Sequence, residues 1–313
     1  MLTQRLALTK SKLTFLDRVK RDKVLLLFFL PCFIWMIVFC YVPMGGIVIA
    51  FQDYKIAKGI LGSEWVGLKF FEQFFNSPRS FNIVLNTIYL SFIKLAFGFF
   101  IPIIFALLLN EVRSRSYLKV VQTVSYMPHF LSWSIVILIF QQLLHPSGGI
   151  FISVASNIFG ISSVNVFSMP EAVRPLAFVT EIWKETGWNS IIYLAALSNV
   201  NSELYEAGAL DGASIWQRMW HISLPSILPT ISIILIFNAG GLLNSNFDQM
   251  WLIRNPANQS TSEVIDTYVY QRAIYDLRYS FGTAVGLFKS VINIALLLST
   301  NFVVRKLGQE SLF

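Results

Sequence analysis

The first long apolar run of this chain limits what it can fold into, because residues 24–52 contain no charged side chain. A helix needs roughly 20 apolar residues to cross the hydrocarbon core of a bilayer. The run is too long for the apolar part of a signal peptide, and no small-x-small cleavage site ends it. We therefore expect a retained first membrane span at 24–51.

Composition supports a membrane protein. Of the 313 residues, 55% are hydrophobic and 13% are charged, whereas soluble domains carry about 25% charged residues. This argues against a soluble enzyme. Scanning for spans of sufficient length gives six candidates: 24–51, 83–109, 120–144, 175–198, 225–247 and 281–304. The predicted fold class is all-α, a polytopic membrane protein with six transmembrane helices.

The distribution of positive charge sets the expected orientation. The basic segment 1–23 holds seven Lys and Arg residues, and Lys and Arg are denser in the segments on its side of the membrane than in 52–82, 145–174 and 248–280. By the positive-inside rule, both termini should be cytoplasmic. The net charge of +7 then needs no nucleic-acid partner. The remaining expected parts are an outer segment at 52–82, a five-helix core at 83–304 and a cytoplasmic tail at 305–313.

Two outer segments are expected to form helices that lie along the membrane face. One is aromatic-rich around residues 65–75, and the other has an apolar stretch at 150–159 that is too short to span. The alternative is that both are loops packed on the helical bundle.

The connection at 199–224 is the most informative part of the chain. Early acidic residues and apolar residues at helical spacing predict one helix, which Gly212 interrupts. Ser214 can cap a second short helix, and Pro225 is expected to open the next span. The result is a helix–glycine–helix elbow on the cytoplasmic side, a shape suited to docking in a groove of another protein.

This elbow resembles the EAA motif of permease subunits of binding-protein-dependent ABC importers. Glu206-Ala207-Gly208 is followed after three residues by Gly212 and after nine more by Ile-Ser-Leu-Pro, ending at Pro225. The motif reads Glu-Ala-Ala, x3, Gly, x9, Ile-x-Leu-Pro, so that only Gly208 departs from it. The resemblance implies an ATPase-coupling role for Glu206, Ala207, Gly208, Asp211 and Gly212.

The resemblance covers roughly residues 81–304. The stretches at 125–133 and 283–290 look like those of the carbohydrate-uptake branch, and more narrowly like the LplB/YteP-like oligosaccharide permeases. It implies a type I ABC importer permease fold in the bacterial cell membrane and oligosaccharide substrates cut from polysaccharides. The implied partners are a second homologous permease, a pair of cytoplasmic ABC ATPase subunits and an extracellular solute-binding protein.

Catalytic motifs are missing from the sequence. It contains no Gly-x4-Gly-Lys-Ser/Thr phosphate loop, so no cofactor is expected in this chain, and ATP with Mg should bind a partner ATPase. The histidines His129, His145 and His221 are scattered, which predicts neither a metal site nor a catalytic residue. A membrane enzyme is therefore disfavoured, and an ion-coupled secondary transporter is the main alternative.

Ionisable residues inside the predicted spans are costly and should face a water-filled cavity or one another. Glu181, Lys184, Glu185 and Trp188 share one helix face, either as a wall of the translocation path or as a self-neutralising pair. Sugar paths combine aromatic faces with amide and charged groups. The predicted path residues are Lys94, Trp133, Glu181, Trp183, Lys184, Glu185, Trp188, Asn189, Asn238, Asn244 and Lys289, with Tyr193 and Asn246 as further candidates.

Two lysines and a glycine pair carry further expectations. Lys94 and Lys289 have no obvious carboxylate in their own spans. Unpaired, they would favour acidic sugars such as uronides; alternatively, they pair across helices with Glu181 and Glu185. The Gly240-Gly241 pair is expected to weaken the fifth span and to permit bending.

Overall fold

The computed structural model describes residues 21–159 and 164–312. Apart from the paired two-residue strands β1 (Gln52–Asp53) and β2 (Glu64–Trp65), its regular elements are helical, so the all-α prediction is confirmed. Most of the predicted basic segment 1–23 lies outside the described residues.

Within the described residues, three continuous helices are long and apolar enough to cross a membrane. They cover the predicted spans 24–51, 83–109 and 281–304. The second and third are α6 (Pro78–Asn110) and α18 (Tyr279–Lys306). The first, Lys23–Phe51, consists of α2 (Lys23–Met36), the π-helix η1 (Ile37–Tyr41), α3 (Val42–Met44) and the 3₁₀-helix η2 (Gly45–Phe51).

The predicted span at 120–144 is not one continuous helix, because the chain bends by 103° within it. Before the bend lie α7 (Arg115–Tyr126) and η3 (Met127–Phe130), and after it lies α8 (Trp133–Leu143). Pro128 lacks the amide hydrogen that a continuing α-helix needs, and Leu131 has extended backbone angles. Ser132 then caps α8 by accepting a hydrogen bond from Ile135 N at 3.3 Å.

The predicted span at 225–247 is also bent, by 63°. Pro225 does not open it, because one helical run continues through Pro225 and breaks at Ile227. Pro229 prevents the helix from continuing, since its ring would clash with the carbonyl one turn earlier. The run before the break comprises α12 (Ile215–Arg218), η6 (Met219–Ser223) and α13 (Leu224–Ser226), and α14 (Leu228–Gly240) follows it.

The fourth predicted span, 175–198, coincides with α10 (Val173–Ser198). At 26 residues it would be about 39 Å long at 1.5 Å per residue, which is enough to cross a bilayer. Arg174, Glu181, Lys184 and Glu185 make it less apolar than the three continuous helices. It packs along α6, so its charged face is placed inside the protein body.

The segment 248–280, predicted as an outer connection, folds back into the protein instead. Its short helices are α15 (Phe247–Ile253), α16 (Gln259–Ser262), α17 (Ile265–Tyr270) and the π-helix η7 (Gln271–Tyr275). Met250, Ile253 and Ile265 are at most 1% exposed and belong to two apolar clusters with residues of α6, α10 and α18. Burial of these side chains explains why the segment does not remain a surface loop.

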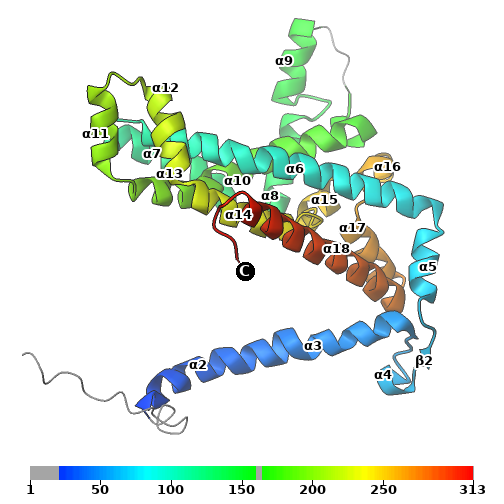
Figure 1. Ribbon diagram of the computed structural model, residues 1–313. Helices are drawn as coiled ribbons and strands as arrows, with labels where there is room; N and C mark the ends of the chain where they lie inside the picture. The colour runs from blue at the N-terminus through cyan, green and yellow to red at the C-terminus, as the bar shows by residue number, and fades with distance from the viewer. Residues whose placement is uncertain (1–20, 160–163, 313) are drawn as a thin grey trace, which may run out of the picture.

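The expected helix at 150–159 is confirmed as α9 (Ile150–Phe159), which projects from the body in Figure 1. The aromatic segment also forms a helix, α5 (Lys69–Phe75), which packs on the bundle through the buried Phe70 and Phe74. Short turns complete the fold: α4 (Gly59–Gly62), η4 (Val166–Ser168) and η5 (Pro170–Ala172).

The long N-terminal helix stands apart from the rest of the structure. Figure 1 shows α2 and α3 extending away from the other helices, and no residue of α2 is buried. Large apolar side chains such as Phe28, 78% exposed, point outward. Such a surface is compatible with lipid or with another membrane subunit.

Candidate functional site

The elbow forms as predicted. The first helix is α11 (Ser202–Leu210), whose cap Asn201 accepts a hydrogen bond from Glu203 N at 3.0 Å. Gly212 follows with φ +79°, a left-handed conformation that favours glycine. Ser214 caps α12, and its N–H donates in turn to Gln217 Oε1 at 2.7 Å. Local sequence therefore specifies both helices and the turn between them.

Close packing joins the two arms of the elbow. Tyr205 OH and Ser223 Oγ share a hydrogen bond of 3.0 Å. A Cβ atom added to Gly208 would lie 3.1 Å from Ile222 Cδ1, so the glycine that departs from the motif sits where the arms approach most tightly. An alanine there would require the Ile222 side chain to shift slightly.

The outer surface of the elbow is rich in exposed apolar and acidic side chains. Leu210 is 90% exposed, and Trp216 and Trp220 are 63% and 65% exposed. Glu206 and Asp211 are exposed as well. An apolar patch rimmed by charges is typical of a protein interaction site.

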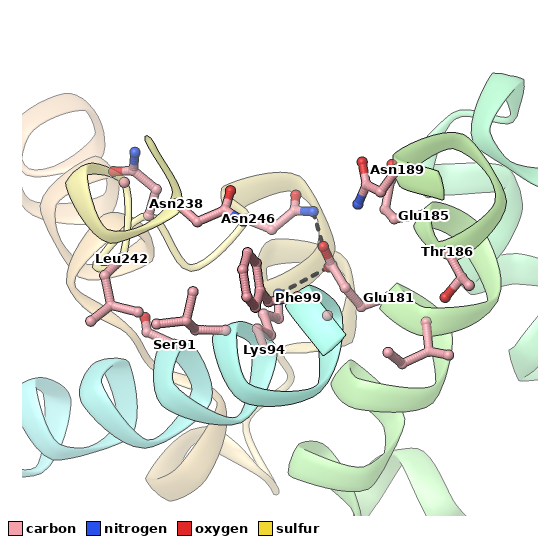
Figure 2. A pocket seen from close by; sticks show the side chains of 15 residues that line it. Ser91, Lys94, Phe99, Glu181, Glu185, Thr186, Asn189, Asn238, Leu242 and Asn246 are labelled. Atoms are coloured by element: carbon pink, nitrogen blue, oxygen red, sulfur yellow. Dashed lines mark hydrogen bonds and ion pairs between the residues drawn. The ribbon is translucent and has the colours of Figure 1, made fainter. Parts of the chain in front are cut away.

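A cavity of about 170 Å³ lies between α6, α10 and the loop after α14 (Figure 2). It brings together six of the predicted path residues, Lys94, Glu181, Glu185, Asn189, Asn238 and Asn244, and also Asn246. The other lining residues are Ser91, Leu95, Gly98, Phe99, Ile182, Thr186, Gly241 and Leu242. We call this the central cavity.

A second hollow of about 550 Å³ continues the central cavity, because both are lined by Gly98, Asn189 and Asn238. Trp188 and Tyr193 contribute its aromatic wall. Together the two hollows place amide groups beside an aromatic ring, a combination that suits a polyhydroxylated ligand.

Lys94 is not an unpaired cation. Its Nζ lies 3.2 Å from Glu181 Oε2 and donates to Gln249 Oε1 at 2.5 Å and to the Ser245 carbonyl at 3.3 Å. Glu181 also accepts a hydrogen bond from Asn246 Nδ2 at 3.4 Å (Figure 2). The expected pairing of Lys94 with Glu181 across helices is therefore confirmed.

Lys289 is also paired, but with Asp266 on α17. Neither expectation named this partner, because Asp266 lies in the segment that was predicted to be outside. The idea that unpaired ammonium groups select acidic sugars therefore loses its premise within the described chain.

The remaining charges on α10 form a pairing network with the turn at η3. Glu185 Oε2 accepts from His129 Nδ1 at 2.7 Å, and Lys184 Nζ lies 3.2 Å from Glu185 Oε1. Lys184 also donates to the His129 carbonyl at 2.5 Å. Trp188 stacks on the His129 ring with a centroid distance of 4.3 Å. Lys184 is thus turned toward η3, whereas Glu185 lines the central cavity.

Besides Lys184, three predicted path residues lie elsewhere. Trp133 packs 5.5 Å from the Lys184 ammonium, Trp183 packs edge-on against Phe140, and Lys289 pairs with α17. None of the three lines the central cavity. They belong to the packing around it.

The Gly240-Gly241 pair does not bend the fifth span, because α14 ends at Gly240. A Cβ atom on Gly240 would lie 2.6 Å from Leu297 Cδ1 on α18. This glycine therefore permits close contact between two helices, and the pair lies at the end of α14 rather than in its interior.

Sequence reasoning missed Gln249, which is fully buried. Its amide donates to the Ala177 carbonyl and to Thr180 Oγ1, both at 2.7 Å, while its oxygen accepts from Lys94. No hydropathy signal marks it, because it lies beyond the last predicted residue of the fifth span. Across the described part of the chain, no group of three or more His, Cys, Asp or Glu gathers to hold a metal ion.

Comparison with known proteins identifies the family. Residues 98–309 match the family described as binding-protein-dependent transport system inner membrane component. Protein LplB of Bacillus subtilis is 42% identical, over 98% of this chain and 96% of its own length. The polygalacturonan/rhamnogalacturonan transport system permease protein YteP of the same species is 43% identical, over 95% of this chain and 92% of its own length.

A solved structure agrees with the sequence relatives. The chain is similar to a permease chain in the crystal structure of a bacterial alginate ABC transporter in complex with an alginate pentasaccharide-bound periplasmic protein. The TM-score is 0.88 at 36% identity, covering 95% of this chain and 99% of that one. These likenesses favour a permease over both an ion-coupled secondary transporter and an enzyme. The chain belongs to the family of inner-membrane components of binding-protein-dependent transport systems and is a multi-pass permease of the ABC importer type.

Proposed function

We propose that this protein is the translocating permease subunit of an ABC importer for acidic oligosaccharides released from polyuronides. The observation that carries the proposal is the similarity, over nearly the whole chain, to permeases named for polygalacturonan and alginate transport. A second solved structure to which the chain is similar is described as an ABC transporter for the import of the acidic polysaccharide alginate.

The elbow is the surface that would couple this chain to ATP hydrolysis. We propose that it docks on one of two cytoplasmic ABC ATPase subunits, through Glu206, Ala207, Gly208, Asp211 and Gly212. The ATPases would bind ATP and Mg, a second homologous permease would complete the path, and an extracellular binding protein would deliver the sugar. Both termini would then lie in the cytoplasm.

Transport requires that ATP and the sugar each favour one conformation of the importer over the other. Closure of the ATPases on ATP would move the two docked elbows together and open the path outward. Hydrolysis would return the path to the inward-open state. Only a difference in affinity for the two states can drive this exchange.

The central cavity would recognise an acidic sugar mainly through amide groups. Lys94 balances Glu181, and Lys184 lies against Glu185, so these four side chains carry no net charge. The amides of Asn189, Asn238, Asn244 and Asn246 line the cavity, and amide N–H groups can donate to carboxylate and hydroxyl oxygens.

Uptake by the assembled importer tests the substrate class. Proteoliposomes containing both permeases, the ATPases and the binding protein should accumulate tetragalacturonate in an ATP-dependent manner, about tenfold faster than maltotetraose of equal length. Equal uptake of the neutral sugar would contradict the proposed selectivity for acidic oligosaccharides. Uptake without any ATPase would contradict the proposal that the protein is part of an ABC importer.

The coupling role of the elbow predicts a loss of ATPase binding in Gly212→Val. A β-branched residue at φ +79° costs about 1–2 kcal/mol or more, which changes the conformation of the turn that would dock. The amount of ATPase that copurifies with the detergent-solubilised protein should fall roughly fivefold or more.

Gly59→Val is the matched control for this variant. Gly59 also has a positive φ, +63°, with nothing within 4 Å of an added Cβ atom, but it lies in α4, far from the elbow in Figure 1. Its ATPase recovery should equal that of the wild type. Equal losses in both variants would mean that general destabilisation, not docking, explains the effect.

A further inference from the structure

A separate hollow, here called the outer cavity, lies beside α15, α16 and η7. It has a volume of about 490 Å³ and is lined by Trp251, Arg254, Asn255, Pro256, Gln259, Gln271 and Tyr275. Ligand sites in proteins typically measure about 300–1,000 Å³. The outer cavity shares no lining residue with the central cavity.

The helices α15 and α16, which contribute residues to the outer cavity, lie toward the end of α6 that is opposite to the elbow (Figure 1). Asn86, near the start of α6, donates to the Ser260 carbonyl of α16 at 2.8 Å. Arg79, also near the start of α6, binds Glu263, which lies next to Arg254 of the outer cavity. Lys94 of the central cavity lies fifteen residues further along α6 than Arg79, which is about 22 Å at 1.5 Å per residue. If the elbow faces the cytoplasm, as the proposed function requires, the outer cavity faces the side from which the sugar arrives.

One wall of the outer cavity is aromatic. The rings of Trp251 and Tyr275 lie 6.1 Å apart with 20° between their planes, and Phe247 stacks behind Trp251 at 5.6 Å. Tyr275 is 65% exposed. Flat aromatic faces of this kind can cover the apolar C–H face of a pyranose ring.

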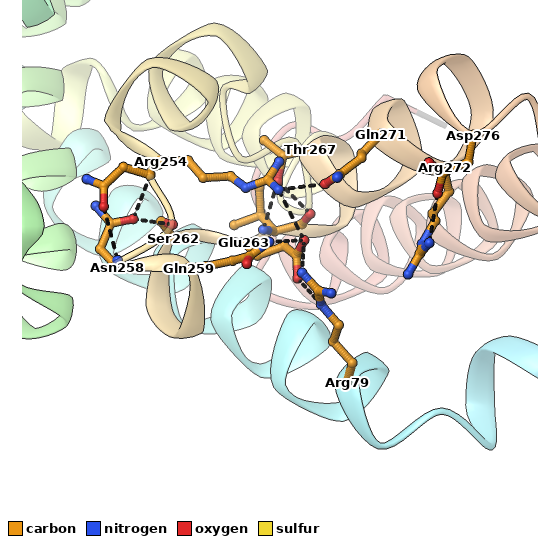
Figure 3. A network of polar contacts seen from close by, with 12 residues as sticks. Arg79, Arg254, Asn258, Gln259, Ser262, Glu263, Thr267, Gln271, Arg272 and Asp276 are labelled. Carbon is orange, nitrogen blue, oxygen red and sulfur yellow. Dashed lines mark hydrogen bonds and ion pairs between the residues drawn. The ribbon is translucent and has the colours of Figure 1, made fainter.

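Arg254, which lines the outer cavity, belongs to a polar network that carries an excess positive charge (Figure 3). The buried Glu263 carboxylate accepts two hydrogen bonds from Arg79, at 2.6 and 2.8 Å, and lies 3.8 Å from Arg254 Nη2. One carboxylate between two guanidinium groups leaves a net charge of +1. Arg254 also donates to Gln271 Oε1 at 2.5 Å, and its planar group has five N–H donors in all, which suits carboxylate binding.

The polar edge of the outer cavity is held in place before any ligand binds. Asn255 and Asn258 both donate to the Phe167 carbonyl, at 2.7 and 2.8 Å, and Asn255 N donates to Asn258 Oδ1 at 2.9 Å. Gln271 and Tyr275 are the first and last residues of the π-helix η7, and short π-helical turns are frequent at functional sites. A preorganised site loses less entropy when it binds.

We propose that the outer cavity is a carbohydrate subsite that holds one uronate unit of the incoming oligosaccharide. The sugar ring would lie on Trp251 and Tyr275, and its carboxylate would face Arg254. The subsite would hold the oligosaccharide as it leaves the binding protein and before it reaches the central cavity. This inference rests on the proposed function and adds to it a second site in the same chain.

Photo-crosslinking of the complete importer tests the subsite. The probe is tetragalacturonate with a diazirine at its reducing end, delivered by the binding protein to the importer in nanodiscs. Mass spectrometry should find crosslinks in peptides covering 247–259 or 270–276, and excess unlabelled tetragalacturonate should compete them away. Tyr275→Ala, at an exposed position, and Arg254→Gln should each reduce these crosslinks about fivefold.

Arg272→Gln is the control, because Arg272 pairs with Asp276 at 2.7 Å and does not line the outer cavity. It should crosslink like the wild type.

Crosslinks confined to other segments would overturn the subsite, as would unchanged crosslinks in both Tyr275→Ala and Arg254→Gln. Loss of binding-protein docking in Tyr275→Ala, with no crosslink to the outer cavity in the wild type, would assign this surface to the binding protein instead. Absence of all tetragalacturonate uptake by the wild type would count against the proposed function, whereas uptake without these crosslinks would count against the subsite alone.

Discussion

Replacing Gly187 by alanine is expected to lower the unfolding temperature of the detergent-solubilised permease by about 10 °C. A Cβ atom at this position would lie 2.1 Å from the Ser125 carbonyl oxygen and 2.5 Å from its carbon. These are backbone atoms of α7 and cannot rotate away, so α7 and α10 must separate at a cost of about 3 kcal/mol or more. Thermal unfolding followed by tryptophan fluorescence would measure the shift.

The same change should also reach the central cavity. Separation of α7 from α10 would pull η3 away from Glu185 and Trp188, which contact His129. Gly286→Ala on α18 is the control, because nothing lies within 4 Å of its added Cβ atom. It should be neutral or slightly stabilising, since alanine favours helix more than glycine does. Equal unfolding temperatures for the two variants would contradict the close approach of α7 and α10.

Lys94→Met is expected to destabilise the protein by about 3–5 kcal/mol and to abolish uptake. The variant leaves the Glu181 carboxylate without its ammonium partner and the buried Gln249 oxygen without its donor. The two side chains are 12% and 21% exposed, and removal of one member of such a largely buried pair exposes the desolvation cost of the other. Denaturation of the solubilised protein and uptake by the assembled importer would measure the two effects.

The double variant Lys94→Met/Glu181→Leu separates folding from transport. Loss of both charges should restore most of the stability, because a buried ion pair can be replaced by apolar groups at little cost. Uptake should remain low, since both residues line the central cavity. Lys58→Met, at an exposed lysine, should change neither property. Full uptake in the double variant would show that the pair has only a structural role.

The sequence predicted the location of helices well and their continuity less well. Apolar runs marked α6 and α18 to within a few residues, because their length and composition are local properties. The bends near Leu131 and Ile227 were not predicted, although Pro128 and Pro229 mark both positions. Proline is compatible with several helix geometries in a membrane, so its presence alone does not tell a kink from a reversal.

For the candidate site, too, the sequence predicted some residues and missed others. Asn189, Asn238 and Asn244 were predicted for the path and all line the central cavity, because polar groups in an apolar span must face a water-filled cavity or other polar groups rather than lipid. Gln249 and Asp266 were missed, since they lie in a segment that hydropathy places outside. Only the inward fold of α15 and α17 brings them to Lys94 and Lys289.

Local sequence is enough to show that this chain lies in a membrane, where its apolar helices run and how its elbow is built. Each of these depends on neighbours along the chain: the length of an apolar run, a cap such as Ser214, or a left-handed turn at Gly212. Which charges are neutralised and which surround a cavity depends on contacts between distant segments of the folded chain. Lys94 meets Gln249 across 155 residues of sequence, and an ion pair inside a membrane protein depends on which helices pack together rather than on the residues beside it in the chain.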